Sequence, residues 1–490
     1  MNFKKFREAL ITASIIGLLS GCTSTAEPQS TNTASSAVQK NFIVKDIDYK
    51  IMVQRATQAA LWAMPAVALV DFKKATMRDL KGEVNQVVYL HKPLDSRHGF
   101  LTANDVTAYG WGTLSTKDGP VVIEVPAATD KVSYFGSILN AWQQPLEDIG
   151  PAGADKGKGG KYLILTPDYE GKIPEGYIVI KSDTTEHGFA FRPRLYNNAT
   201  DLDAAEYAKT IKIYLLADAK NPPATVHIDS AEVPYLGLPV YDHTFFQDIN
   251  DVIQNNPVRR QDKAMMGMIS DLGIIKGRDF MPSEKQVAAM AEGLSLAYEK
   301  MMSMFVTPGE ALLPLWPGKS QWQYWNFTKG QPQLGFPYET ENELLIDGRA
   351  SAYFYVTYLP KYLGGGTFYL TGIRDSNGDL YDGESTYKLN VPKDTPAKDF
   401  WSVIVYSMRT KGFVEGAPRV GLSSRNIDSM VMNDDGSYDV YFGPNPPKGF
   451  EANTIPTNEN FFLLFRLYGP ESKTFFKTWQ LGNLEKLPIK

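Results

Sequence analysis

Cys22 is the single cysteine of this 490-residue chain, and it limits what the chain can fold into. With one cysteine there is no internal disulfide, so stability must come from the burial of an apolar core. The hydrophobic share of 43% and the aromatic share of 12% are sufficient for such a core. The length suggests roughly two to three domains.

The residues before Cys22 have the composition of a secretory signal. Basic residues between positions 4 and 7 precede an apolar stretch over residues 9–19, too short to span a bilayer. The ending Leu18–Cys22 resembles the lipobox of bacterial lipoproteins, which implies a signal peptide over 1–22 and a lipid on the Cys22 thiol. The alternative is an ordinary signal peptide with a chance cysteine. An acylated Cys22 would exclude cysteine nucleophiles, zinc–cysteine sites and iron–sulfur clusters.

This resemblance predicts that the protein is located in the bacterial cell envelope, where it is lipid-anchored and faces the periplasm. Thr23, rather than an aspartate, after the cysteine favours the outer membrane. Residues 23–40 are rich in Ser, Thr and Ala, which predicts a disordered tether. The net charge of −5 gives no sign of a basic surface for nucleic acid, so nucleic acid is not an expected partner. The expected contact with the membrane is the lipid on Cys22. Whether the protein forms a homo-oligomer is left open by the sequence.

Residues 41–240 are expected to form an N-terminal helix and a β-rich domain. Apolar residues at three- and four-residue spacing predict the helix from about residue 47 to 69, and Pro65 is expected to kink or end it. Short β-type runs bounded by Gly and Pro occur at 87–90, 121–125, 162–165 and 177–180. Their spacing favours an antiparallel sandwich over alternating β-α units.

Residues 241–335 change to helical patterning and are expected to connect the first β domain to a second. Ser283 and Gln286 form a capping box before an apolar stripe that reaches Phe305. Over 336–490 β patterning returns, at 368–370, 387–391, 401–406, 438–442 and 461–467. The predicted fold class is mainly β with α: two antiparallel, jelly-roll-like β-sandwich domains joined by a helical connector.

Two segments resemble known domains. Residues 101–216 resemble domain of unknown function 1254, through the motifs Thr102–Tyr109, Gly119–Val122, Ala141–Trp142, Gly160–Leu163 and Gly171–Pro174. Residues 340–487 resemble its usual companion, domain of unknown function 1214, through Asn377–Gly383, Phe400–Ser402, Asp435–Ser437 and Phe465–Pro470. Together the segments cover over half of the chain in the family's order. The resemblance implies an exported β-rich protein with a helical connector and supplies no established reaction.

The chain departs from the family's pattern where carboxylates are expected. The first motif usually reads Thr-Pro-Asn-Asn-Asp-Thr, but here Ala103 replaces the proline, Asp105 the second asparagine and Val106 the aspartate. Asn140 stands where an aspartate precedes the Ala-Trp pair. The loss of both carboxylates favours binding over catalysis. At 353–356 the residue types favour a strand, whereas the resemblance implies a helix, and both stay open.

A ligand-binding site is expected where polar and aromatic side chains follow one another before a predicted strand. The candidates are Asn104, Asp105, Thr107, Tyr109, Trp111, Arg192 and Arg194. If 107, 109 and 111 alternate to one face, they could line a pocket, and a guanidinium at 192 or 194 could pair with an anion. The competing interpretation is turn residues, core aromatics and structural ion pairs.

No cofactor and no metal are predicted. The five histidines lack metal-ligand spacing, and the Gly- and Lys-rich segment 153–161 misses the P-loop spacing. Residues 375–379 suit the turn of a hairpin better than a calcium loop, because Gly378 stands at the wrong position for an EF-hand. An aromatic platform for sugars, or packing under a loop, would explain Trp316, Trp322, Tyr324 and Trp325.

Two functions of different class stay open. The first is binding of a small molecule or glycan, or scaffolding, in the periplasm, with a pocket near the first β domain or at its junction with the second. The second is a hydrolase-like enzyme that acts on an envelope or scavenged small molecule. In it, Asp105 would be the general base and Tyr109 or Arg192 would stabilise charge.

Overall fold

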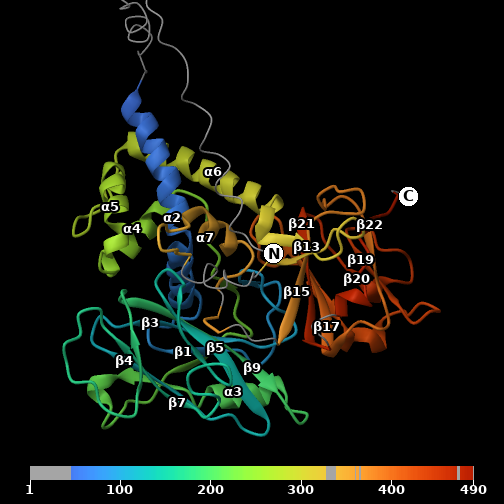
Figure 1. Ribbon diagram of the computed structural model, residues 1–490, viewed down its shortest axis with the longest axis horizontal. Coiled ribbons are helices and arrows are strands. Elements are labelled where there is room, and N and C mark those ends of the chain that lie inside the picture. The colour runs from blue at the N-terminus through green and yellow to red at the C-terminus, as the bar shows by residue number, and fades with distance from the viewer. Residues whose placement is uncertain (1–45, 327–337, 359, 363–365, 472–474, 489–490) are drawn as a thin grey trace, which may run out of the picture. The chain divides into compact units, whose positions relative to one another are not determined.

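The computed structural model describes residues 46–326, 338–358, 360–362, 366–471 and 475–488. The predicted signal peptide and tether lie outside the described residues. Residues 48–490 form one compact unit, separate from residues 1–47. This unit is mainly β with helices, as predicted: two antiparallel β-sandwich domains, with helices before the first, between the two and within the second along the chain (Figure 1).

The first sandwich has a sheet of six strands against one of four. The six-stranded order is β11 (His227–Asp229), β1 (Val87–Tyr89), β3 (Gly110–Ser115), β9 (Glu186–Leu195), β5 (Val132–Asn140), β6 (Pro145–Ile149). The four-stranded order is β10 (Lys212–Leu215), β4 (Val121–Val125), β7 (Gly160–Leu165), β8 (Ile178–Lys181). Only the edge strands β11 and β8 pair in parallel with their neighbours. Alternating apolar residues of both sheets fill the core, with the short helix α3 (Asp201–Ala208) against it.

The second sandwich repeats this arrangement of sheets. Its six-stranded order is β13 (Leu312–Pro314), β14 (Gln323–Trp325), β15 (Thr367–Gly372), β21 (Phe461–Pro470), β17 (Ala397–Ser407), β18 (Gly421–Ser423). Its four-stranded order is β20 (Thr454–Ile455), β19 (Tyr438–Phe442), β16 (Tyr387–Val391), β22 (Glu485–Lys486). One face of β21 packs into the sandwich core and the other faces the helices and the first sandwich. The register places Tyr369 and Ser402 on either side of Arg466.

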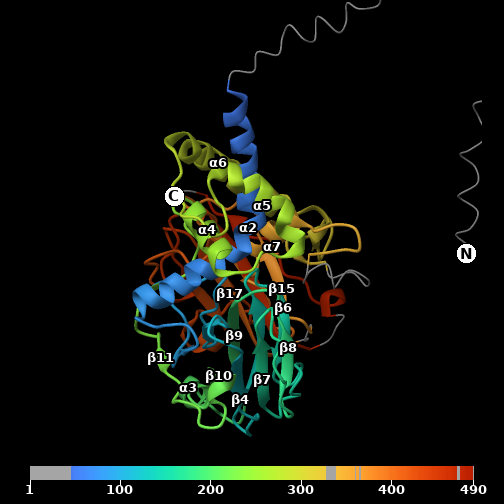
Figure 2. The ribbon, with the colours of Figure 1, turned by 90° about the vertical axis from the view of Figure 1, so that its left-hand side faces the viewer.

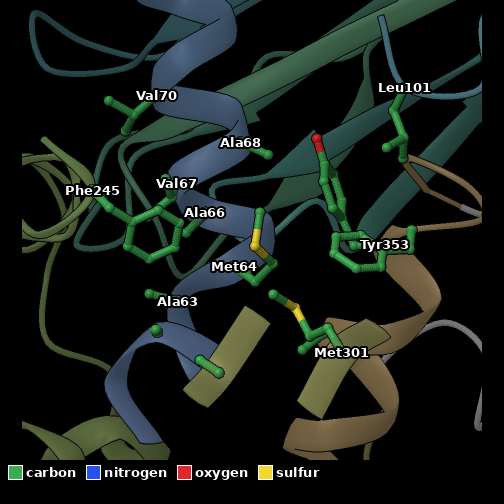
Figure 3. Close-up of a cluster of buried hydrophobic side chains, with 14 of the residues drawn as sticks. Ala63, Met64, Ala66, Val67, Ala68, Val70, Leu101, Phe245, Met301 and Tyr353 are labelled. Carbon is green, nitrogen blue, oxygen red and sulfur yellow. The ribbon is translucent and has the colours of Figure 1, made fainter. Parts of the chain in front are cut away.

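The helices pack around α2 and share one hydrophobic core with the facing sheets (Figures 1 and 2). They are α2 (Ile47–Asp79), α4 (Phe245–Asn255), α5 (Lys263–Ile269), α6 (Glu284–Val306) and α7 (Ile346–Tyr353). Figure 3 shows small side chains of α2 beside Phe245, Met301 and Tyr353. Gly293 of α6 brings the two longest helices close, because a Cβ there would lie 2.5 Å from the Cβ of Ala56.

The prediction that α2 ends near residue 69 is wrong, since the helix continues past Pro65 to Asp79. Residues on both sides of the proline are almost completely buried, and Gln143 Nε2 donates a hydrogen bond to the Pro65 carbonyl at 2.6 Å. Burial of an apolar helix on all sides outweighs the backbone hydrogen bond that proline removes.

The structure also decides two other local predictions, the conformation of residues 353–356 and the hairpin turn at Asn377–Gly378. At 353–356 the chain is helical only as far as Tyr353, where α7 ends. The turn at Asn377–Gly378 forms, closed by Gly378 N–H to the Asp375 carbonyl at 3.1 Å. An antiparallel bridge between Arg374 and Leu380 closes it as a short hairpin. The longer strands on either side belong to different sheets, because β15 pairs with β14 and β21, whereas β16 pairs with β19 and β22.

None of the helices in the described ranges combines the length and apolarity needed to cross a membrane.

Candidate functional site

The segment 102–106, between β2 (His98–Gly99) and β3, is bound by side chains of the second sandwich. Its first two carbonyls accept hydrogen bonds from Arg466 Nη2, at 3.0 Å, and from the Tyr406 hydroxyl. The amide of Asn104 donates to the Tyr468 hydroxyl at 2.6 Å. The motif of the first domain is therefore held by β17 and β21 of the second.

Further contacts fix both ends of this segment. Thr102 has a left-handed backbone, with φ of 41°, which costs free energy in a residue other than glycine. Its amide donates to the Lys411 carbonyl at 2.8 Å and its hydroxyl to the Tyr355 carbonyl at 3.0 Å. At the other end Arg425 Nη1 donates to the Val106 carbonyl at 3.0 Å. These hydrogen bonds offset the strain and give the segment one conformation.

This conformation places the Asp105 carboxyl against the second sandwich. Its Oδ2 faces Gly421 of β18, where a Cβ would come within 2.5 Å, so only glycine leaves room for the carboxyl. Its Oδ1 is buried without a hydrogen-bond partner among the described residues. Burial raises the pKa of Asp105 to about 6, although the positive charge of Arg466 opposes the rise.

Two guanidinium groups, one from each sandwich, lie near Tyr109, Tyr369 and Tyr468, and one of them, Arg466, also acts on the Asp105 carboxyl. Arg466 is 2% exposed, and its Nε and Nη1 have no partner in the described part of the chain. Arg192 of β9 is half-buried, with Cζ 4.3 Å from the ring centre of Phe135. Burial lowers the pKa of both arginines, but the tyrosine hydroxyls that surround them outweigh this effect and raise it. Both groups therefore stay charged.

Tyr369 of β15 interacts with both arginines. It lies directly opposite Arg466 in the register, with the Arg466 Cζ 5.3 Å from its ring centre. Burial alone would raise the pKa of Tyr369, but the positive charges of Arg192 and Arg466 lower it below its usual value. A phenol in this position is easier to deprotonate than one in water.

We call these convergent groups the junction cluster. Its members are Asp105, Tyr109, Arg192, Tyr369, Arg466 and Tyr468. Two more buried hydroxyls without partners among the described residues lie on the same elements: Thr107, two residues beyond Asp105, and Ser402, opposite Arg466 in the register. Unpaired buried polar atoms are rare in proteins, so several on neighbouring elements indicate a place where a ligand or ordered water binds.

The structure brings four of the predicted site residues together: Asn104, Asp105, Tyr109 and Arg192. Thr107 lies on the same segment, and its side chain is paired with no described residue.

Trp111 and Arg194 lie elsewhere. The expected alternation of 107, 109 and 111 on one strand face does not occur, because β3 begins only at Gly110. Trp111 is 3% exposed and packs edge-to-face against Phe72, Phe100 and Tyr235, with ring centres 5.0–5.6 Å apart. Arg194 is exposed and lies over Tyr196, 5.5 Å from its ring centre. The position of Trp111 matches the competing interpretation given above, a core aromatic.

The cluster members of the second sandwich were missed by sequence reasoning. One signal was present: Arg466 is the single charged residue in the buried strand Phe461–Pro470. Arginine is almost never fully buried without a reason, so its position marks a functional or structural polar group. No comparable signal marks Tyr369, whose role follows from the register alone.

Other candidate sites take structural roles. Trp316 and Trp322 are buried, and their indole N–H groups donate to the Phe476 and Gly482 carbonyls at 2.9 and 2.8 Å, so these two rings form core rather than a sugar platform. Asn140 accepts hydrogen bonds from two backbone amides of its own turn, each at 3.0 Å. No group of three or more metal-ligating side chains occurs within the described ranges.

Two family models match the chain in tandem. Residues 84–215 match the protein of unknown function DUF1254, and residues 366–472 match the protein of unknown function DUF1214. The junction cluster draws Asp105, Tyr109 and Arg192 from the first match. It draws Tyr369, Arg466 and Tyr468 from the second. No match was found among curated proteins.

Two solved structures are similar to the chain. The VPA0106 protein from Vibrio parahaemolyticus is 17% identical, with a TM-score of 0.51, over 89% of this chain and 100% of its own. An uncharacterised protein from Burkholderia cenocepacia is 10% identical, with a TM-score of 0.36, over 90% and 95%. The first likeness concerns the fold alone. On its two matched domains, the chain belongs to the family of proteins that carry DUF1254 and DUF1214 in tandem.

Proposed function

We propose that the protein binds a small organic anion at the junction cluster, as a lipid-anchored component of the bacterial envelope. One observation carries the proposal: Arg466 is buried and charged, and two of its nitrogens have no partner among the described residues. A buried guanidinium normally has its donors satisfied, because each unpaired donor costs free energy. An anionic ligand would satisfy them.

The balance of charge in the cluster supports an anion rather than a neutral glycan. Arg192 and Arg466 contribute two positive charges, and the single carboxyl among the cluster members, Asp105, cancels at most one of them even when it is ionised above its pKa of about 6. The neighbouring Tyr109, Tyr369 and Tyr468 add hydroxyl donors and aromatic surface. Arginine with such donors binds carboxylates in bidentate geometry.

A paired substitution on β9 tests this proposal. Arg192→Met removes a guanidinium of the cluster, whereas Arg194→Met removes an exposed guanidinium two residues away on the same strand. Calorimetric titration with acetate, benzoate, succinate and inorganic phosphate should give saturable binding of at least one anion. We expect Arg192→Met to weaken it by ~10-fold or more and Arg194→Met to leave it unchanged. Equal effects of both variants, or no binding, would refute the site.

A hydrolase-like activity is the second candidate. It is favoured by Asp105, whose raised pKa of about 6 and unpaired Oδ1 suit a general base near neutral pH. Turnover of small esters that is lost in Asp105→Asn and retained in Arg194→Met would favour catalysis over binding alone.

A further inference from the structure

We infer that the junction cluster takes up a proton when it binds its anion, and that the Asp105 carboxyl receives this proton. The inference rests on the proposed function and adds a control by pH to it. Its basis is the position of one carboxyl among groups that would otherwise attract a ligand's negative charge.

An anion bound to Arg466 would come under the influence of Asp105, because Arg466 acts on this carboxyl electrostatically. The carboxyl has one unpaired oxygen, Oδ1, and Arg466 has two unpaired nitrogens. The two groups thus interact, and each keeps hydrogen-bonding capacity that a third group could use.

The other groups that face Asp105 do not offer an alternative proton acceptor. From β17 comes the Tyr406 hydroxyl, which already donates to a backbone carbonyl, and from β18 comes Gly421, which has no side chain. From β21 comes Arg466, which acts on Asp105 electrostatically, and Arg425 of η6 (Ser424–Ser429) is bound to the neighbouring Val106 carbonyl. Asp105 is therefore the acidic group of the junction cluster, and Arg466 is the cation that acts on it.

A ligand carboxylate bound to Arg466 would be repelled by an ionised Asp105, and the two carboxylates would compete for the same guanidinium. Transfer of a proton from solvent to Asp105 removes the repulsion, and the resulting O–H can donate a hydrogen bond to the bound anion. No bond other than O–H forms, and the total charge of the cluster rises by one before the anion lowers it again. Protonated Asp105 and the ligand carboxylate would then share one proton through a hydrogen bond.

The pKa of Asp105 sets the pH range in which this coupling is visible. In the free protein burial holds it at about 6, and a bound anion would raise it further by charge repulsion. Below pH 6 the carboxyl is already protonated and affinity is at its maximum. Above pH 6 each bound anion must bring a proton, so affinity falls by up to tenfold per pH unit until the pKa of the complex is reached.

Calorimetry measures this proton directly. Benzoate, acetate, succinate and phosphate are titrated at pH 5 to 8.5 in buffers of different ionisation enthalpy, and the slope of binding enthalpy against buffer enthalpy gives the protons taken up. We expect uptake that approaches one proton between pH 6.5 and 8. In Asp105→Asn the uptake should vanish and the affinity at pH 8 should rise by tenfold or more. Asp201→Asn, which alters a carboxyl near Arg425 outside the cluster, is the matched control and should keep the uptake.

The possible outcomes separate the two proposals. Binding that is lost in Arg192→Met but shows no proton uptake would overturn the role of Asp105 and leave the anion site standing. Absence of binding for every probe at every pH would overturn both. If Asp105→Asn does not fold, as judged by circular dichroism, the proton count of the native protein with Asp201→Asn alone decides the question.

Discussion

Ionisable side chains inside a protein keep their charge only where a partner or water supports it. Asp71 of α2 is an example away from the junction cluster. It faces Asp248 of α4, and Lys74 bridges Asp248 and Asp251, the latter at 2.7 Å. Burial, together with the charge of Asp248, raises the pKa of Asp71 to about 8. The two carboxyls therefore share a proton at neutral pH.

This pair predicts how stability changes with pH. The folded-state pKa of about 8 lies above the ordinary 3.8, so the folded state binds the proton more tightly. The resulting stability is complete below about pH 4 and is lost as the pH rises toward 8. Asp71→Asn should be about 2 kcal/mol more stable than the native protein at pH 8.5, and similar at pH 4.5, in urea unfolding. Asp251→Asn, which removes only the outer ion pair, should show no such gain. A gain that is equal at both pH values would contradict the shared proton.

At the residue scale the sequence predicted half of the junction cluster. Asp105, Tyr109 and Arg192 were recognisable because polar groups preceded a strand or flanked a proline. Tyr369, Arg466 and Tyr468 were not, because their role depends on which strands become neighbours and on a face that meets the first domain. Contacts between residues more than 300 positions apart, such as Asn104 with Tyr468, leave no local pattern.

At the scale of elements, close helix packing depends on residues without side-chain bulk. Gly293 of α6 meets α2 so closely that a Cβ would lie 2.5 Å from the Ala56 Cβ and 2.8 Å from backbone atoms of Val53 and Thr57. Backbone atoms cannot move aside cheaply. The crossing of the two helices is therefore set by the absence of a Cβ at this one position.

Alanine substitutions measure this close approach. Gly→Ala inside a helix ordinarily gains up to about 1 kcal/mol from helix propensity. Gly293→Ala should instead lower the free energy of unfolding by about 1–3 kcal/mol, because the overlap with α2 outweighs the propensity. Gly267→Ala in α5, where no atom lies within 4 Å of the new Cβ, is the control and should be neutral or stabilising. Equal changes in both variants would refute the tight crossing.

Strand positions were well predicted, and the errors arose where tertiary packing decided. The runs at 87–90, 121–125, 387–391 and 438–442 correspond to β1, β4, β16 and β19. Their alternation or apolar continuity is a local property. By contrast, Pro65 was expected to kink or end α2 and the helix was expected to stop near residue 69, but burial on every side of the proline carried the helix past it. The turn at 377–378 was recognised, but the sheets to which its flanking strands belong were not.

At the scale of the whole molecule, the attachment of the chain to a membrane depends on Cys22, which lies outside the described residues. Cys22→Ala should release the protein from the membrane fraction into the soluble periplasmic fraction, because the sulfur that would carry the lipid is gone. Cys22→Ser offers a second variant of closer size. The measurement is fractionation with immunoblotting, beside metabolic labelling with a fatty acid. Unchanged fractionation and unchanged labelling would contradict lipidation and favour an ordinary signal peptide.

The binding of segment 102–106 by β17 and β21 has a consequence for how the two domains evolve. A gene rearrangement that exchanged one half of the chain for an unrelated domain would leave Thr102 strained and Arg466 buried without its carbonyl partner. Such a product would lose stability and the candidate site together. Selection then acts on the two halves as one unit, and a substitution in the segment is tolerated only when β17 and β21 accommodate it. We therefore expect the residue pair 104–468, which is joined through its side chains, to change together, when it changes, among tandem relatives.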